Sequence, residues 1–301
     1  MRVIFLGTGG SLPSPKRNVS AIALQTGPEI LLFDCGEGTQ RQFMLSSASF
    51  MKVTSVFITH LHGDHFLGIP AFVQSLSFSG RTKPLHIFGP PGTAETVKAM
   101  LGLGYFSSSF TVTACDLQDG ESVSFFGYDV KAVGVDHTVP SLGYVLEEKM
   151  RPGKFNLKKA RELDVPEGPM FRSLQEGHAI KIGSRTITPD MVLGPPRKGR
   201  KIAISGDTRP SKKLIRAARG ADVLIHEATL ESSLAEEAKE YGHTTAAEAA
   251  KIAKEAKVKN LYLYHISSRY DDSTVLLQEA RRIFPNSYIA EDLTDFQVNI
   301  S

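Results

Sequence analysis

The chain has 301 residues, which is enough for one large domain or two smaller ones with a substantial core. A hydrophobic fraction of 41% and a charged fraction of 22% exclude collagen-like, coiled-coil and wholly disordered proteins. The net charge of +3 by itself predicts no partner. No apolar run approaches the roughly 18 residues of a membrane helix, so we expect no membrane span. The two cysteines, Cys35 and Cys115, suit a reducing cytoplasm, where we expect the protein to be located.

Apolar periodicity and glycine turns predict a first half made of strands with a few helices between them. The expected strands are 2–6, 20–25, 29–33, 53–59, 85–88, 111–116, 122–126 and 130–135. The expected helices are 37–45, a segment from Phe66 into the seventies, and 93–101.

The next segment carries the excess of positive over negative charge in the chain. Residues 149–201 contain 13 Lys and Arg against 5 Asp and Glu, whereas the other residues contain 22 and 27. This asymmetry suggests a phosphate-rich partner, although a solvated insertion without a ligand would show the same charge. Weak periodicity and turn signals such as Pro152-Gly153 predict an insertion over residues 147–199 with at most small pieces of structure. We therefore expect one domain over 1–301 that carries a basic inserted arm.

The last third again alternates strands and helices. The expected strands are 201–205, 222–226, 261–264, 287–290 and 296–300. The expected helices are 243–257 and 273–283, with further helical pattern after each of the first two strands. Because both flanks of the insertion mix strands and helices, we expect two sheets packed face to face with helices outside.

The strongest chemical signal is the run His60-x-His62-x-Asp64-His65. An extended stretch projects alternate side chains to one side, so His60 and His62 can hold one ion. Gly63 allows a tight turn that directs Asp64 and His65 to a second position nearby. Imidazole and carboxylate ligands together suit zinc, and manganese or iron are the alternatives.

Three later strands end at further ligand types. Val133–Val135 leads into His137, Ile202–Ser205 into Asp207, and Leu261–Tyr264 into His265. A single His or Asp at such a position is more often a cap or a surface residue. Three of them in order after the first cluster favour one metal site at the rim of a sheet.

This set resembles the metallo-β-lactamase superfamily, in which an HxHxDH motif is followed by a His, an Asp and a His at later strand ends. The resemblance implies a four-layer αββα sandwich with two zinc ions per subunit. It implies that His60, His62 and His137 hold one ion and that Asp64, His65 and His265 hold the other. Asp207 would bridge the pair. Such sites hydrolyse esters, lactams, thioesters and phosphodiesters, so the superfamily does not name the substrate.

Three short motifs narrow the resemblance to the ribonuclease Z family. Pro13–Asn18 is similar to its PTxxRN loop, His226-Glu227-Ala228-Thr229 matches its HEAT motif, and His243-Thr244-Thr245 matches its downstream His-Ser/Thr motif. The resemblance implies that His243, oriented by Glu227, donates a proton to the leaving oxygen; the alternative is a helix-capping contact between them. Asp64 would accept a proton besides ligating, and Arg17 or neighbouring backbone groups would stabilise the charge that develops on the phosphate.

The basic insertion occupies the place of the tRNA-gripping arm of that family. Gly168-Pro169 followed by Leu174-Gln175-Glu176-Gly177 is similar to the arm's motif. Phosphate contacts do not depend on the nucleotide sequence, and they weaken as the salt concentration rises. Their independence of sequence suits the recognition of a shape that tRNAs share. The expected RNA-binding residues are Arg17, Lys154, Lys158, Lys159, Arg161, Gly168, Pro169 and Arg172. The short form of the family implies a homodimer.

The sequence therefore predicts a zinc-dependent endoribonuclease that removes the 3′ trailer of precursor tRNA. It would leave a 3′-hydroxyl on the tRNA and a 5′-phosphate on the trailer. Two rivals stay open: a hydrolase of small phosphodiesters or sulfate esters, and a non-catalytic RNA-binding protein with a structural metal. A relative of mRNA 3′-end nucleases is disfavoured, because only 58 residues separate Asp207 from His265.

Overall fold

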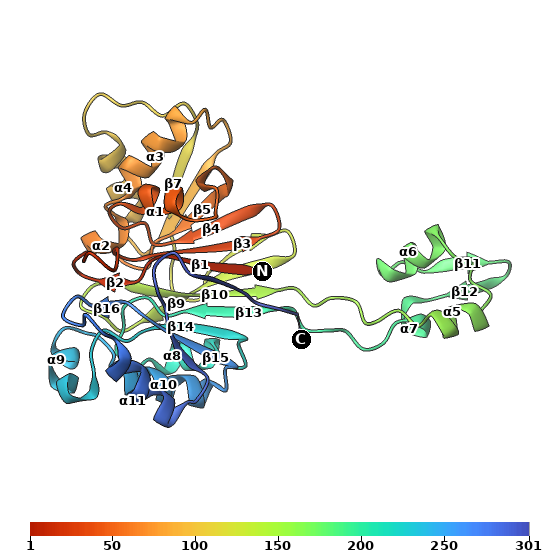
Figure 1. Cartoon of the computed structure of the whole chain (residues 1–301). Helices are drawn as coiled ribbons and strands as arrows, with labels where there is room; N and C mark the ends of the chain where they lie inside the picture. The colour runs from red at the N-terminus through yellow and green to blue at the C-terminus, as the bar shows by residue number, and fades with distance from the viewer. Residues whose placement is uncertain (301) are drawn as a thin grey trace. The chain divides into compact units, whose positions relative to one another are not determined.

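A computed structural model describes residues 1–300 (Figure 1). The chain forms two compact units. The first contains Met1–Phe125, Val130–Leu146 and the chain from Arg200 onward; the second contains Phe126–Asp129 and Glu147–Gly199.

The first unit is built on two seven-stranded sheets. One has the order β18 (Asp295–Gln297), β1 (Arg2–Gly7), β3 (Ala21–Thr26), β4 (Glu29–Phe33), β5 (Val53–Phe57), β6 (Leu85–Gly89), β7 (Val112–Asp116). The other has the order β17 (Ser287–Ile289), β15 (Asn260–Tyr264), β14 (Val223–Glu227), β13 (Lys201–Ile204), β10 (Ser141–Glu148), β9 (Tyr128–Val135), β8 (Ser122–Phe125). A short parallel pair, β2 (Gly9–Gly10) and β16 (Ile266–Ser267), lies apart from both.

Helices cover the outer face of each sheet. The helices of the first half are α1 (Thr39–Leu45), α2 (Gly63–Phe66), α3 (Ile69–Phe78), α4 (Thr93–Leu101) and the 3-10 helix η1 (Phe50–Lys52). Those of the second half are α8 (Lys212–Ala217), α9 (Ala235–Glu240), α10 (Ala246–Ala256), α11 (Thr274–Ile283) and the 3-10 helix η2 (Ser232–Leu234). One core packs α1, α3 and α4 on the first sheet, and a second core packs α8, α10 and α11 on the other.

Aromatic side chains fill the space between the two sheets. Phe57 of β5 packs 5.3 Å from both Phe33 of β4 and Tyr144 of β10, measured between ring centroids. The Tyr144 hydroxyl donates a 2.6 Å hydrogen bond to the carbonyl of Ile58, which follows β5. Helix, sheet, sheet and helix thus form four layers, which confirms the predicted αββα sandwich (Figure 1).

The structure differs from the sequence-based expectation most clearly at three places. Strand β10 was not predicted, because its buried residues continue into Glu147-Glu148 and merge with the charged insertion. The helix expected from Phe66 is split into α2 and α3 at Gly68, whose Cα approaches the carbonyl of Gly36 too closely for a side chain. Helix α10 begins three residues later than expected, because Thr245 and Glu248 form a capping box there.

The second unit has more structure than the sequence predicted. It contains α5 (Leu157–Glu162), α6 (Pro169–Gln175), the antiparallel pair β11 (Ile180–Ile182) and β12 (Arg185–Ile187), and α7 (Pro189–Val192). These elements enclose a small core of their own, made of Ala160, Val165, Phe171, Leu174, Ile187 and Val192. The core residues are spaced irregularly along the chain, so no helical or strand period marks them.

Within residues 1–300, none of the helices combines the length and the hydropathy that a membrane-spanning segment requires. Cys35 and Cys115 are both free thiols.

Candidate metal centre

The ends of strands in both sheets deliver the predicted ligand residues to one place. His60 follows β5, His62 precedes α2, and Asp64 and His65 lie within α2. Strands β13, β14 and β15 run parallel, so their carboxyl ends meet at one edge. The structure brings together all seven predicted side chains: His60, His62, Asp64, His65, His137, Asp207 and His265.

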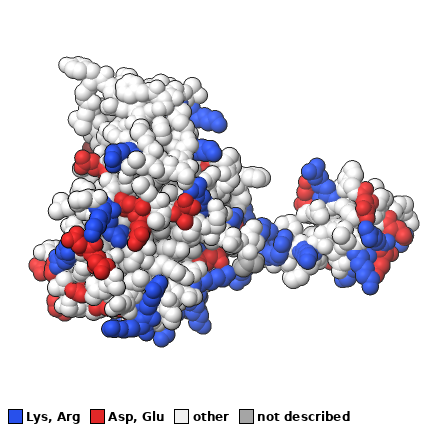
Figure 2. All heavy atoms as spheres, viewed as in Figure 1, with Lys and Arg blue, Asp and Glu red and all other residues white. Residues whose placement is uncertain are grey.

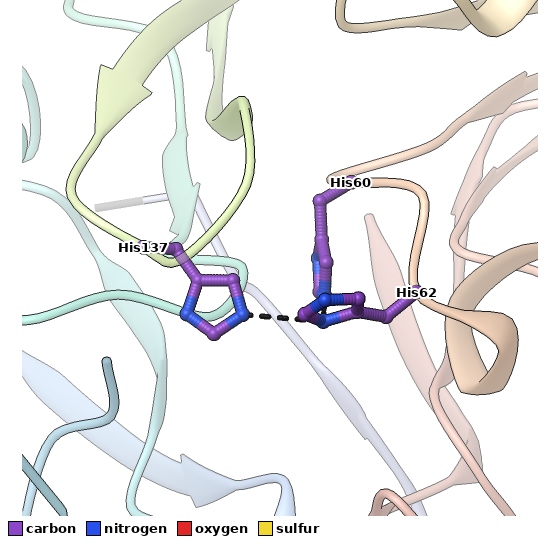
Figure 3. A group of neighbouring side chains, drawn as sticks. All are labelled: His60, His62 and His137. Atoms are coloured by element: carbon purple, nitrogen blue, oxygen red, sulfur yellow. Dashed lines mark hydrogen bonds between the residues drawn. The ribbon is translucent and has the colours of Figure 1, made fainter. Parts of the chain in front are cut away.

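Three imidazoles form the first group (Figure 3). Nδ1 of His62 lies 3.1 Å from Nε2 of His60 and 3.3 Å from Nε2 of His137. A tetrahedral zinc ion with bonds of about 2.0–2.1 Å holds its ligand nitrogens about 3.3 Å apart. The spacing of these nitrogens therefore fits such an ion.

A carboxylate and two imidazoles form the second group. Oδ2 of Asp64 lies 3.3 Å from Nε2 of His65 and 3.3 Å from Nε2 of His265, and the two nitrogens are also 3.3 Å apart. Oδ2 of Asp207 lies 3.4 Å from His65, 3.2 Å from His265 and 3.7 Å from His60. Asp207 therefore stands between the two groups, where a bridging ligand is expected.

Hydrogen bonds on the far side of the rings fix their orientation. Nδ1 of His137 donates to the carbonyl of Gly242 at 2.9 Å, and Nδ1 of His65 donates to Oδ2 of Asp34 at 2.7 Å. Nε2 of each ring is thereby directed toward the other ligand atoms, where a bound cation would be coordinated.

The electrostatics of the cluster favour positive charge. Burial acts to raise the pKa of Asp207, but His265, His65 and His60 outweigh it and hold the pKa well below its ordinary value. Burial acts to lower the pKa of His65, but Asp207 and Asp34 outweigh it and raise the pKa well above its ordinary value. Buried carboxylates beside buried imidazoles are thus the donor set of a divalent metal.

His243 lies beside the cluster and is paired with Glu227. Its Nδ1 is 3.1 Å from Oε1 of Glu227 and 3.9 Å from Oδ2 of Asp207. Burial acts to lower the pKa of His243, but the charge and hydrogen bond of Glu227, with Asp207, raise it to about 9. The cap of α10 is made by Thr245 and Glu248, so the His243–Glu227 contact is not a helix cap.

A pocket of about 560 Å³ opens next to this group. His137 and Gly242 form part of its wall, which also carries two cations, Arg209 and Lys239, and two carboxylates, Asp136 and Glu240.

Comparison with known proteins identifies the family. The family model described as anti-Pycsar protein Apyc1 matches residues 1–151, a segment that ends before Asp207 and His265. Ribonuclease Z of Methanosarcina acetivorans is 46% identical over 99% of this chain and 98% of its own length. Ribonuclease Z of Methanothermobacter thermautotrophicus is 48% identical over 99% and 97%. The chain belongs to the ribonuclease Z family.

A solved structure agrees with this assignment. The crystal structure of human tRNase Z, short form (ELAC1), matches with a TM-score of 0.74 and 30% identity, and each chain is covered completely. Zinc-bound PqqB from Methylobacterium extorquens, at 14% identity and a TM-score of 0.64, shows the fold alone.

Arg17, in the loop that resembles the ribonuclease Z PTxxRN motif, makes three hydrogen bonds within the protein. Its guanidinium donates to Oγ1 of Thr8 at 2.6 Å, to the carbonyl of Ala290 at 2.7 Å and to Oγ of Ser273 at 3.2 Å. Burial lowers its pKa. These contacts tie the loop to Thr8 and to the C-terminal segment, and an interaction of Arg17 with the phosphate stays a prediction.

The other predicted RNA-binding residues all lie in the second unit and are exposed. They are Lys154, Lys158, Lys159, Arg161, Gly168, Pro169 and Arg172. Three of the cations face carboxylates of the same unit: Lys158 with Glu162, Arg161 with Glu167, and Arg172 with Glu176, at 3.9, 2.8 and 3.8 Å. Pairs this exposed contribute little to stability and can be exchanged for other partners.

Sequence reasoning missed several groups that hold the ligands. Gly242, whose carbonyl is the partner of His137, immediately precedes the His243 motif. Its φ of +73° lies in the left-handed region, which explains why a glycine occupies this position. The backbone N–H of Ser11 donates to Oδ2 of Asp64 at 2.8 Å. Thr229 completes the HEAT motif: Nδ1 of His265 donates to its Oγ1 at 3.0 Å, and that hydroxyl donates to Glu227. The Thr that ends the HEAT motif was the sequence signal that could have identified this residue.

Proposed function

We propose that the protein is a zinc-dependent endoribonuclease that cleaves precursor tRNA after the acceptor stem. The cut would leave a 3′-hydroxyl on the tRNA and a 5′-phosphate on the trailer. The observation that carries the proposal is the convergence of seven ligand side chains in a chain of the ribonuclease Z family, with His243 beside them.

We assign two zinc ions to each subunit, with manganese as a substitute. His60, His62 and His137 would hold one ion, and Asp64, His65 and His265 the other, with Asp207 between them. When bound, the ions would supply Lewis-acid stabilisation of the phosphate charge and would acidify water. Asp64 would serve mainly as a ligand, because hydrogen bonds from His265 and His65 outweigh burial and lower its pKa, which makes it a weak base.

His243 is the proposed proton donor. A ribose 3′ oxygen is a poor leaving group unless it gains a proton as the bond breaks. The charge and hydrogen bond of Glu227, with the charge of Asp207, raise the pKa of His243 and so favour its protonated ring. Because Glu227 accepts from Nδ1, the remaining nitrogen, Nε2, would give its proton to the leaving oxygen.

The second unit is the proposed tRNA-binding exosite. The whole positive excess of the chain lies in residues 149–201, and the proposed contacts are exposed side chains on a separately packed core. Both signs of charge appear on this unit in Figure 2. Changing Lys154, Lys158 and Lys159 to Ser would leave that core intact. We expect KM to rise roughly 10-fold or more. We also expect KM to depend less steeply on salt concentration, because with each lost phosphate contact about one counterion fewer is released from the RNA on binding.

A homodimer is the proposed assembly. Apolar side chains are exposed at the ends of α1 and α3 and after α4, namely Leu45, Phe78 and Tyr105. In Figure 2 the part of the first unit that contains these helices carries few charged residues. Light scattering should give a mass near twice 32.8 kDa, and Phe78→Glu should shift it toward the monomer. A monomeric wild type would overturn this assignment.

We also propose a cytoplasmic location, which the two unpaired thiols suit. Fractionation of cells with an antibody against the protein tests it. Recovery outside the cytoplasm would contradict it.

Purified protein, loaded with zinc or manganese, should cut a precursor tRNA transcript at one position, and end-labelling should show the two expected end groups. His243→Ala should reduce kcat on this substrate by roughly 100-fold or more. It should spare bis(p-nitrophenyl) phosphate, whose p-nitrophenolate leaves without a proton. Turnover of the small diester with no cutting of precursor tRNA would instead favour a hydrolase of small phosphodiesters.

A further inference from the structure

We propose that Arg209 is a positioning residue for His243, whose backbone it holds beside the cluster. The inference rests on the proposed function, because it gives Arg209 a part in the same proton transfer. Arg209 follows Asp207 by two residues, and its side chain is 21% exposed.

The guanidinium of Arg209 joins two groups on either side of the helix start. Nη1 donates to the carbonyl of His243, and Nη2 lies 2.9 Å from Oε1 of Glu248. The other oxygen of Glu248 accepts from the backbone N–H of Thr245 at 2.9 Å, which caps α10. The planar fork of arginine can satisfy a carbonyl and a carboxylate together, which one lysine ammonium cannot do in the same geometry.

The peptide on the other side of His243 is also held. The carbonyl of Gly242 accepts from Nδ1 of His137 at 2.9 Å, and the hydroxyl of Thr244 donates to the carbonyl of Thr208. Both carbonyls that flank the His243 side chain are therefore fixed. The Gly242 carbonyl is fixed by a proposed metal ligand, and the His243 carbonyl by Arg209.

The backbone of Arg209 is fixed in turn. Its N–H donates to the carbonyl of Asp136 at 2.6 Å, and Oγ1 of Thr208 accepts from the N–H of Asp136 at 3.1 Å. The segments that carry His137, Asp207 and His243 thus meet at Arg209. A guanidinium held in this way can fix the position of the His243 ring relative to the strand ends.

A direct phosphate contact is the other role open to an arginine beside this pocket. Two observations disfavour it: the guanidinium nitrogens face the His243 carbonyl and Glu248, and the Glu248 carboxylate neutralises the charge. Lys239 lines the same pocket and is exposed, with no carboxylate within the salt-bridge distance among the described residues. Loss of Arg209 should therefore lower kcat and leave KM nearly unchanged, whereas loss of a phosphate contact would raise KM.

The test compares a substrate that needs a proton with one that does not. Kinetics are measured for wild type, Arg209→Ala and Arg209→Lys on precursor tRNA and on bis(p-nitrophenyl) phosphate. We expect kcat on precursor tRNA to fall roughly 10- to 100-fold in both variants, with KM within about twofold. Turnover of the small diester should stay within about threefold. Arg216→Ala removes an exposed arginine of α8 and serves as the matched control, with no expected change on either substrate.

Melting temperature and metal content, measured on the same samples, show whether the metal cluster and the fold are intact. Equal losses on both substrates, a change confined to KM, or no change would each overturn the inference. If Arg209→Ala does not fold, Arg209→Lys carries the test, because it keeps the charge and loses the fork. A wild type that fails to cut precursor tRNA contradicts the proposed function instead, so the two failures are distinguishable.

Discussion

Oε1 of Glu227 lies 3.1 Å from Nδ1 of His243, and the other carboxylate oxygen accepts from the hydroxyl of Thr229 at 2.7 Å. The same hydroxyl accepts from Nδ1 of His265. One buried carboxylate, the last residue of β14, therefore orients both the proposed proton donor and, through Thr229, a proposed metal ligand. Charge at this position affects two parts of the site at once.

Glu227→Gln should separate these two effects. The amide keeps the shape of the side chain and removes the charge that holds a proton on His243. We expect kcat on precursor tRNA to fall roughly 10- to 100-fold, while turnover of bis(p-nitrophenyl) phosphate changes little. Glu236→Gln, at an exposed position of α9, is the control. A variant that processes precursor tRNA at the wild-type rate would show that the charge of Glu227 is dispensable.

Asp34→Asn should weaken metal binding without removing a ligand. Asp34 accepts hydrogen bonds from Nδ1 of His65, from the hydroxyl of Ser20 and from both the N–H and the hydroxyl of Thr59. An asparagine would turn its NH₂ group toward one of these donors, so His65 loses a charged acceptor. We expect metal affinity to fall roughly 10- to 100-fold in a competition with a fluorescent zinc chelator. Asp271→Asn, at a side chain that is 98% exposed, should bind zinc as the wild type does. Unchanged affinity of the Asp34 variant would contradict this role.

The convergence of the proposed ligands could be predicted from the sequence because each of them follows an apolar strand. The carboxyl ends of β13, β14 and β15 meet at one edge, so Asp207, Glu227 and His265 converge whatever the rest of the chain does. The groups that orient them could not be predicted in this way. Gly242 meets His137 across 105 positions of sequence, and Arg209 meets His243 across 34. Neither contact corresponds to a periodic pattern in the sequence.

The errors in the predicted fold also arise where the local pattern of polarity does not mark an element. Strand β10 is buried along most of its length but ends in charged residues, so local polarity concealed it. The core of the second unit takes one or two apolar residues from each of α5, α6, β12 and α7, together with Val165 from a loop, and local pattern cannot group these residues. Long elements with a clear period, such as α4, were predicted with the bounds that the structure has.

The two cysteines should differ sharply in reactivity. Cys35 is fully buried, and burial raises the pKa of its thiol to about 12, whereas Cys115 is exposed on β7. Because the thiolate is the reactive form, raising the pH from about 8 to about 10 should not make Cys35 react. A disulfide reagent should titrate one thiol in the native protein and two after unfolding. Cys115→Ser should leave no fast-reacting thiol, and rapid reaction of that variant would show that Cys35 is accessible.

Gly10→Ala should disturb the second metal group through a contact distant in sequence. A Cβ at residue 10 would lie 2.6 Å from Cε1 and Nδ1 of His265, so the ring must move. Moving it breaks the hydrogen bond from His265 to Thr229 and lengthens the 3.3 Å separation between His265 and Asp64. We expect metal content to fall from two ions toward one, and activity on precursor tRNA to fall roughly 100-fold.

Gly102→Ala is the matched control, because residue 102 has a φ of −84° and its added Cβ meets no atom closer than 3.4 Å. That variant should keep both ions and gain about 0.4–1 kcal/mol of unfolding free energy from the stiffer unfolded chain. Metal analysis and thermal melting of the two variants make the comparison direct. If Gly10→Ala retained two ions and full activity, the close approach of residue 10 to His265 would have no part in the site.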